Sequence, residues 1–239
     1  MIKNIGKKSR WLFCAVLFTI HYSLFTTSCS KLFEVEEFAD DQMVVAELSL
    51  ARHAVDLMVG DEFLLPVDVT PDTLAASGIY WESADTAVVR ISGGRLTAVG
   101  PGEATVTAIA LAGLKSDTCR IRVLDRWALD PYAFLYDMVV YADVSINGRA
   151  ADDDTLVGAF GTDADGCTQL KGLGSLRHSP DGRQYMVLRT YSNAVDGESL
   201  SLRCYDRSRA LLLESPTALV FQSNATLGTL SRLYAIVFE

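Results

Sequence analysis

The sequence predicts an all-β protein that consists of two β-sandwiches in tandem. From residue 43 onward, short runs rich in β-branched and aromatic residues follow one another closely. Gly, Pro and Asp residues separate these runs, as they do at the turns that join antiparallel strands. Between residues 43 and 125 no segment shows a helical period. Many short strands at such spacing are typical of sandwiches and not of enzymes built on a parallel sheet.

Residues 1–28 have the features of a secretory signal. They carry four basic residues and no acidic one, and the apolar run over residues 11–25 is short for a membrane-spanning helix. Thr26, Thr27 and Ser28 then lead to Cys29. A cysteine directly after small residues resembles the lipobox of bacterial lipoproteins, which implies that Cys29 is acylated and begins the mature chain. The alternative is an ordinary signal that is cleaved nearby.

The charge of the chain excludes one class of partner. Removing residues 1–28 takes away four basic residues and no acid, so the net charge moves from −9 to −13. Such a surface repels the phosphates of nucleic acids, and it also disfavours an anionic bilayer. Attachment to a membrane would therefore depend on the lipid at Cys29. Ser30 follows it, and in the lipoproteins that this site resembles, an aspartate there signals retention in the inner membrane. We therefore expect an outer-membrane lipoprotein.

The chain divides into four regions. Residues 29–42 are acidic and lack a strong period, which indicates a tether. Strand-like segments then continue to residue 125, where a charged pair and Pro131 interrupt the pattern. We therefore expect a signal over residues 1–28, the tether over 29–42, a first sandwich over 43–125 and a second over 126–239.

Three stretches of the first sandwich carry a known pattern. They are "LMVGDEFLLPVDVTP" (57–71), "YWESADTAVVRISGGRLTAVGPGEATVTA" (80–108) and "DTCRIRVL" (117–124). Together they resemble a bacterial immunoglobulin-like domain of group 2. The residues that match the family pattern are Val59, Gly60, Leu65, Trp81, Ser83, Val88, Gly94, Leu96, Ala98, Gly102, Ala104, Val106 and Ala108. The resemblance implies that the glycines lie at hairpin turns and that Trp81 belongs to the core.

The second region again predicts a sandwich. In "DMVVYADVSI" (137–146) the apolar residues alternate, so one strand face consists of Met138, Val140, Ala142, Val144 and Ile146. "LVGAFGTDADGCTQLKG" (156–172) and "YMVLRTYSNAVDGESLSLRCYD" (185–206) resemble, more loosely, a C-terminal module of exported bacterial surface proteins. The matching residues are Val157, Ala159, Phe160, Gly161, Cys167, Gly197, Leu200, Leu202, Tyr205 and Asp206. The predicted fold is therefore two tandem immunoglobulin-like β-sandwich domains.

Catalytic motifs are missing from the sequence. It contains no H-E-x-x-H, C-x-x-C or G-x-S-x-G pattern, so common zinc sites and an α/β-hydrolase nucleophile have no support. We expect neither enzyme activity nor a cofactor. One acidic cluster could bind calcium through carboxylate oxygens, although Asp and Gly also simply favour turns. Its members are Asp152, Asp153, Asp154, Asp163 and Asp165.

Threonines and cysteines are candidates for modification. Thr73, Thr86 and Thr155 each follow an aspartate and precede an aliphatic residue, a triplet that resembles an O-glycosylation signal of some anaerobic gut-type bacteria. Ordinary turn threonines are the alternative. A Cys167–Cys204 bridge could form in an oxidising compartment, whereas Cys119 and Cys204 each share a strand face with aliphatic residues and look like buried hydrophobes.

These features predict a non-catalytic lipoprotein of the cell surface, which serves in adhesion or presents its C-terminal domain outward to an extracellular protein or glycan. The alternative is a glycan-binding lipoprotein of a polysaccharide-uptake system. Trp127, Tyr132, Tyr136 and Tyr191 gathered on one solvent face would favour that alternative. A hydrolase would instead need two carboxylates that face each other across a cleft.

Overall fold

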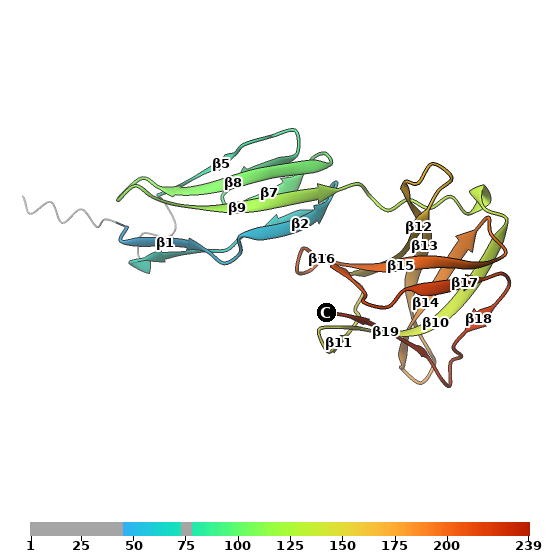
Figure 1. Ribbon diagram of the computed structural model, residues 1–239. Helices are drawn as coiled ribbons and strands as arrows, with labels where there is room; N and C mark the ends of the chain where they lie inside the picture. The colour runs from blue at the N-terminus through green and yellow to red at the C-terminus, as the bar shows by residue number, and fades with distance from the viewer. Residues whose placement is uncertain (1–44, 73–77) are drawn as a thin grey trace, which may run out of the picture. The chain divides into compact units, whose positions relative to one another are not determined.

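The computed structural model describes residues 45–72 and 78–239, and nearly all of its regular structure is β-strand (Figure 1). The predicted signal, Cys29 and the tether lie outside these residues. The described residues before position 125 form nine strands. They are β1 (Glu47–Leu50), β2 (Ala54–Met58), β3 (Glu62–Leu64), β4 (Val67–Thr70), β5 (Ile79–Ser83), β6 (Val89–Ser92), β7 (Arg95–Ala98), β8 (Gly102–Ala110) and β9 (Lys115–Leu124).

The first nine strands form a sandwich of small sheets. The order β2-β9-β8-β5 makes one layer, β3-β7-β6 makes another, and β1 pairs with β4. Alternating residues of β8 and β9 point into the space between the layers, where Val106, Cys119 and Ile121 are fully buried. Trp81 lies half-buried against this core. It borders an open hollow of about 240 Å³ beside Leu64 and Gly94.

A short 3-10 helix, Pro131–Ala133, precedes the remaining strands. They are β10 (Tyr136–Ile146), β11 (Arg149–Ala150), β12 (Thr155–Thr162), β13 (Thr168–His178), β14 (Gln184–Ser192), β15 (Asp196–Asp206), β16 (Leu211–Glu214), β17 (Leu219–Gln222), β18 (Thr226–Leu227) and β19 (Tyr234–Phe238).

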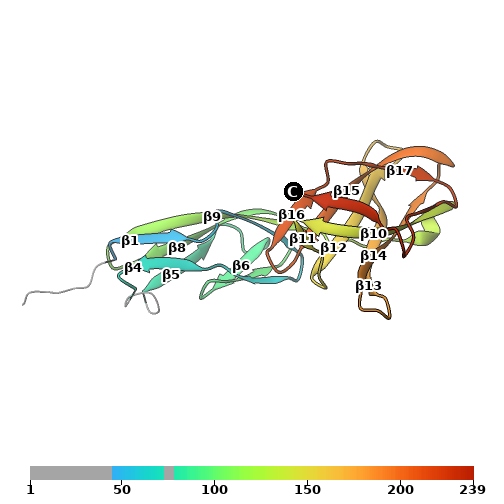
Figure 2. The same cartoon turned by 90° about the horizontal axis from the view of Figure 1, so that it is seen from below.

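Two long strands close the second sandwich. The main sheet has the order β11-β10-β14-β13-β12-β15-β16. β10 also pairs with β18 and β19, and the first half of β15 pairs with β17, so both strands belong to two layers. The predicted inner face of residues 137–146 is confirmed, because Met138, Val140, Ala142, Val144 and Ile146 are all buried. Figure 2 shows this sandwich from below, with the β13–β14 hairpin projecting from it. The all-β prediction of two tandem sandwiches is therefore correct.

Candidate functional site

A β-bulge directs one lysine side chain into the interior of the second sandwich. Between β12 and β13, Phe160 lies opposite Leu170 but Ala159 lies opposite Gly172, so Lys171 is the extra residue of the bulge. A bulge re-aims the side chain at the position where it occurs. Lys171 consequently points inward and is buried, although a long charged side chain is seldom buried without a partner.

Glu198 of β15 is the partner of Lys171. Strand β12 lies between β13 and β15, and at the crossing point it carries Gly161. A Cβ atom on Gly161 would overlap the Glu198 carboxylate and lie 2.9 Å from Lys171 Cδ. The missing side chain therefore lets the two charged groups meet above β12. Only 7% of the Lys171 side chain and 16% of the Glu198 side chain are exposed.

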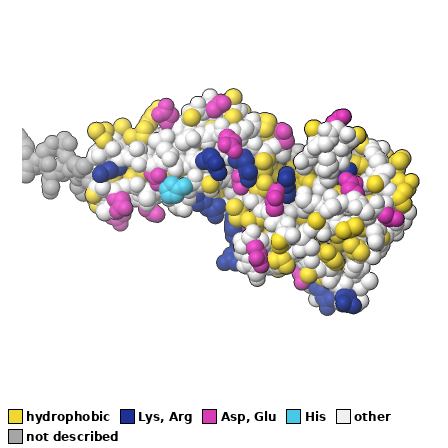
Figure 3. Space-filling model, viewed as in Figure 1, with side chains coloured by type: hydrophobic (Ala, Val, Ile, Leu, Met, Phe, Trp, Pro, Cys, Tyr) yellow, Lys and Arg dark blue, Asp and Glu magenta, His cyan; other side chains and the backbone are white. Residues whose placement is uncertain are grey.

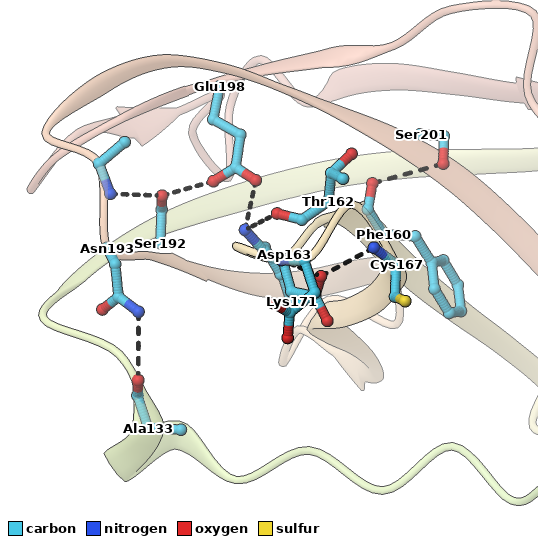
Figure 4. A network of polar contacts seen from close by, with 12 residues as sticks. Ala133, Phe160, Thr162, Asp163, Cys167, Lys171, Ser192, Asn193, Glu198 and Ser201 are labelled. Atoms are coloured by element: carbon cyan, nitrogen blue, oxygen red, sulfur yellow. Dashed lines mark hydrogen bonds and ion pairs between the residues drawn. The ribbon is translucent and has the colours of Figure 1, made fainter.

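The ion pair belongs to a larger polar network (Figure 4). Lys171 Nζ also donates to the Thr162 carbonyl over 2.9 Å, and Ser192 Oγ donates to the second oxygen of Glu198. The Ala194 amide donates to Ser192 Oγ over 2.9 Å, while the neighbouring Asn193 is exposed and accepts from the Leu135 amide over 3.0 Å. Each of these buried polar groups thus has a partner.

This network is structural. A serine, a lysine and a glutamate together could suggest an activated nucleophile. Ser192 is completely buried, however, so a substrate cannot reach its hydroxyl. The network instead ties the start of β15 and the β14–β15 turn to β12 and β13. The sequence offers no signal for it, because the bulge that re-aims Lys171 has no motif of its own.

A second polar cluster lies between the two sandwiches. β2 is an edge strand of its sheet, and two of its amides find partners on the second sandwich. The Asp56 amide donates to the Ala210 carbonyl over 3.0 Å, and the Met58 amide donates to Tyr205 Oη over 3.3 Å. The Leu212 amide in turn donates to Asp56 Oδ2 over 3.1 Å. The second sandwich thus covers a strand edge that would otherwise offer free donors.

Tyr205 is the centre of this contact. Its side chain is fully buried, and its hydroxyl donates to Asp61 Oδ2 over 2.8 Å. Arg207 Nε lies 3.4 Å from the other oxygen of the same carboxylate. Burial, followed by the hydrogen bond to Asp61, raises the pKa of Tyr205 far above its usual range. The hydroxyl is therefore a permanent donor that joins the sandwiches.

The outer face of β14 carries two tyrosines and an arginine around one valine. Met186, Leu188, Thr190 and Ser192 point inward and are buried, which leaves Tyr185, Val187, Arg189 and Tyr191 on the opposite face. Tyr141 of β10 lies beside Tyr185, with 6.2 Å between the ring centroids. The Arg189 guanidinium lies 5.7 Å from the centre of the Tyr191 ring. The stretch "RQYMVLRTYS" (183–192) predicted a strand but carried no signal that marked this face as a site.

The four aromatic residues singled out from the sequence do not form one platform. Trp127 packs edge-on against Phe160, with ring centroids 5.2 Å apart. Tyr136 packs against the core, whereas Tyr132 is 96% exposed. Tyr191 stacks on Phe134 at 6.0 Å, on the outer face of β14. Of these four aromatic residues, only Tyr191 thus lies on the outer face of β14.

The five aspartates of the proposed calcium cluster lie in two turns. Asp152 accepts hydrogen bonds from the Asp154 amide and the Thr155 hydroxyl, over 3.2 and 2.9 Å. Asp163 likewise accepts from the amides of Asp165 and Cys167, over 3.0 and 2.8 Å. Over residues 45–72 and 78–239 no group of three or more His, Cys, Asp or Glu side chains could hold a metal ion. The arrangement is that of turns that stabilise themselves.

The candidate modification sites have different surroundings. Thr86 is exposed in a turn, and Thr73 lies outside the described residues. Thr155 is buried and its hydroxyl donates to Asp152, and a glycan at this position stays a prediction.

The cysteines are unpaired in the described structure. Cys167 is exposed and Cys204 is buried, so the bridge considered from the sequence is not formed. Cys119 and Cys204 lie inside their cores, as their strand faces predicted. Burial raises the pKa of Cys119 to about 11 and that of Cys204 to about 12.

Known proteins give limited guidance. No protein-family model matches the chain. An uncharacterized protein of Clostridium acetobutylicum is 30% identical over 108 residues, which make up 44% of this chain and 11% of that protein. The chain thus spans about a tenth of the length of this relative.

Solved structures that resemble the chain include surface-layer and immunoglobulin-domain proteins. Domains 4–9 of the surface layer protein SbsC are 12% identical, with 78% of this chain and 32% of that chain covered and a TM-score of 0.31. Domains 4 and 5 of SbsC are 14% identical, with 77% and 99% covered and the same TM-score of 0.31. The four N-terminal immunoglobulin domains of Dscam1 are 16% identical, with 80% and 52% covered and a TM-score of 0.24. Scores below 0.5 support no argument about function. Among the described residues, no helix has the length and apolar character needed to cross a membrane.

Proposed function

We propose that this chain is a non-catalytic module of the cell envelope, anchored by a lipid at Cys29, that displays its second sandwich for adhesion at the outer surface. The predicted signal, the lipobox-like site and the group 2 immunoglobulin-like resemblance support this proposal. Residues 29–42 would then form the tether, with the first sandwich over residues 43–125 and the second over 126–239.

The contact between the sandwiches is the observation that carries the proposal. Hydrogen bonds join β2 and Asp61 to Tyr205, Ala210 and Leu212, and Tyr205 is fully buried there. Inter-domain motion is the default unless the interface is large and hydrophobic. Here Ala210 of the second sandwich belongs to the buried apolar cluster of the first, and Met58 beside Tyr205 is buried. A joint of this kind suits a part that holds a binding surface in a fixed direction, whereas flexible loops around a cleft would suit catalysis.

Acylation and exposure at the surface can be tested together in the native host. We expect labelled palmitate to be incorporated into the wild-type chain and not into Cys29→Ser. Protease added to intact cells should digest the chain while a periplasmic marker survives. A chain that incorporates no label, or that only lysed cells make accessible, would contradict the proposal. The substitution lies outside the two sandwiches, so their thermal unfolding serves as the control for folding.

A further inference from the structure

We infer that the outer face around β14 binds an acidic polysaccharide. This arginine–tyrosine face consists of Tyr141, Arg177, Arg183, Tyr185, Arg189 and Tyr191. The inference rests on the proposed function, because an extracellular polysaccharide can reach this face only if the second sandwich is displayed outside the cell.

The strand register brings these side chains to one surface. Arg177 lies opposite Tyr185 in the β13–β14 ladder, so both residues point to the same side of the sheet. Arg183, Tyr185, Val187 and Arg189 follow one another on that side, because side chains two residues apart share a strand face. All three arginines are exposed. From residue 185 to residue 191 the strand spans about 20 Å, which suits a saccharide chain better than a single sugar.

Two of the arginines are free to bind an anion. Over residues 45–72 and 78–239, Arg177 and Arg183 take part in no ion pair, whereas Arg189 Nε lies 2.9 Å from Asp137. Arg183 Nη1 donates to the Leu230 carbonyl over 3.0 Å, which holds the guanidinium at the hairpin tip with other N–H groups left over. Asp143, near Tyr185, and Asp181, in the turn beside Arg183, are the other acids in this area. A planar guanidinium matches the two oxygens of a carboxylate or sulfate.

The location of these charges favours an extended anionic ligand. The whole chain has a net charge of −9, so a polyanion is repelled by most of its surface. Lys and Arg side chains gather at the lower end of the second sandwich in Figure 3, where Figure 1 shows the tip of the β13–β14 hairpin. A negatively charged chain would therefore be drawn to this tip and then lie along β14.

The tyrosines explain why the ligand should be a saccharide. Their rings are held by neighbours, Tyr185 by Tyr141 and Tyr191 by Phe134 at 6.0 Å. Half-buried rings that are already ordered lose little conformational freedom on binding. The C–H face of a pyranose packs on such rings, while the hydroxyl of each tyrosine stays available as a polar partner.

The test measures binding of the full-length protein in detergent to polygalacturonate and to heparin, which carry carboxylates and sulfates. Neutral dextran and inorganic polyphosphate are the comparison ligands. We expect saturable binding to at least one acidic polysaccharide, no binding to dextran, and weakening as salt is added. Arg177→Ala/Arg183→Ala should weaken binding about tenfold or more and reduce its salt dependence. Tyr185→Ala/Tyr191→Ala should weaken it about fivefold or more, and Tyr185→Phe should weaken it less.

The first sandwich supplies a matched control. Arg95→Ala/Tyr80→Ala removes an arginine and a tyrosine that are both more than half exposed there, and it should leave binding unchanged. Thermal unfolding of every variant separates lost binding from lost folding. Any of four results would overturn the inference: equal binding to dextran, binding to polyphosphate alone, an equal loss in the control variant, or no binding to either acidic polysaccharide. If the surface tests succeed and these binding tests fail, only the ligand assignment is wrong.

Discussion

The two sandwiches bury different kinds of side chain. In the first, the core consists of aliphatic residues, and the buried Asp61 belongs to the contact with the second sandwich. In the second, Thr155, Lys171, Thr190, Ser192 and Asp206 are all buried. An aliphatic core tolerates changes that conserve volume, whereas a buried polar network requires every partner. The comparison suggests that the first sandwich is a plain scaffold and that the second is held in one particular conformation.

The largest difference between the sandwiches should follow from breaking the Lys171–Glu198 pair. Lys171→Met leaves the Glu198 carboxylate buried without its partner, so we expect a loss of about 3–5 kcal/mol in the free energy of unfolding. Lys171→Met/Glu198→Met should recover most of this loss. The Arg95–Glu62 pair of the first sandwich is exposed, and Arg95→Met should therefore cost less than about 1 kcal/mol. Urea unfolding measures all three, and equal costs for the two single changes would refute the comparison.

Tyr205→Phe should have an intermediate effect. It removes the donor to the buried Asp61, and we expect a loss of about 1–3 kcal/mol. Because the folded pKa of Tyr205 is raised above the ordinary value of 10.0, its contribution is complete below pH 10.0 and declines as the pH rises further. The stability difference between wild type and Tyr205→Phe should therefore shrink at alkaline pH. Tyr80→Phe in the first sandwich is the control, and an identical pH profile for both variants would count against this assignment.

The smallest expected effect concerns thiol reactivity and is the same for both cores. Cys119 and Cys204 have raised pKa values because they are buried, one in each sandwich, so neither forms the reactive thiolate readily. We expect an aromatic disulfide reagent to label Cys167 quickly in the folded chain, and to label Cys119 and Cys204 only after urea is added. Mass spectrometry of the peptides identifies the labelled thiols. Rapid labelling of Cys204 without urea would show that the second core opens more easily than its packing indicates.

Most of the fold could be predicted from the periodicity of the strands. The alternation over residues 137–146 predicted the buried face of β10, and the faces of Cys119 and Cys204 were also assigned correctly. Such assignments succeed because side chains alternate strictly along a strand that has no bulge. The surroundings of Trp81 were predicted only in part, since its ring borders an open hollow as well as the core.

The polar sites could not be predicted, for a physical reason. At Lys171 a bulge interrupts the alternation, so a charged residue enters the interior without any local signal. The burial of Thr155 likewise depends on its position at the start of β12, opposite Asp206 of β15. The Tyr205–Asp61 hydrogen bond joins residues that lie 144 positions apart in the chain. Contacts at this separation come from topology, which periodicity does not encode.

The covered edge of β2 has a consequence for fragments of the chain. A fragment that ended near residue 125 would keep the pairing of β2 with β9 but would lose the groups that accept from Asp56 and Met58. Two unsatisfied amides on one strand edge form a template for a strand of another molecule. We therefore expect the isolated first sandwich to self-associate and the intact chain to remain monomeric. In the intact chain, the second sandwich therefore covers the β2 edge and prevents this self-association.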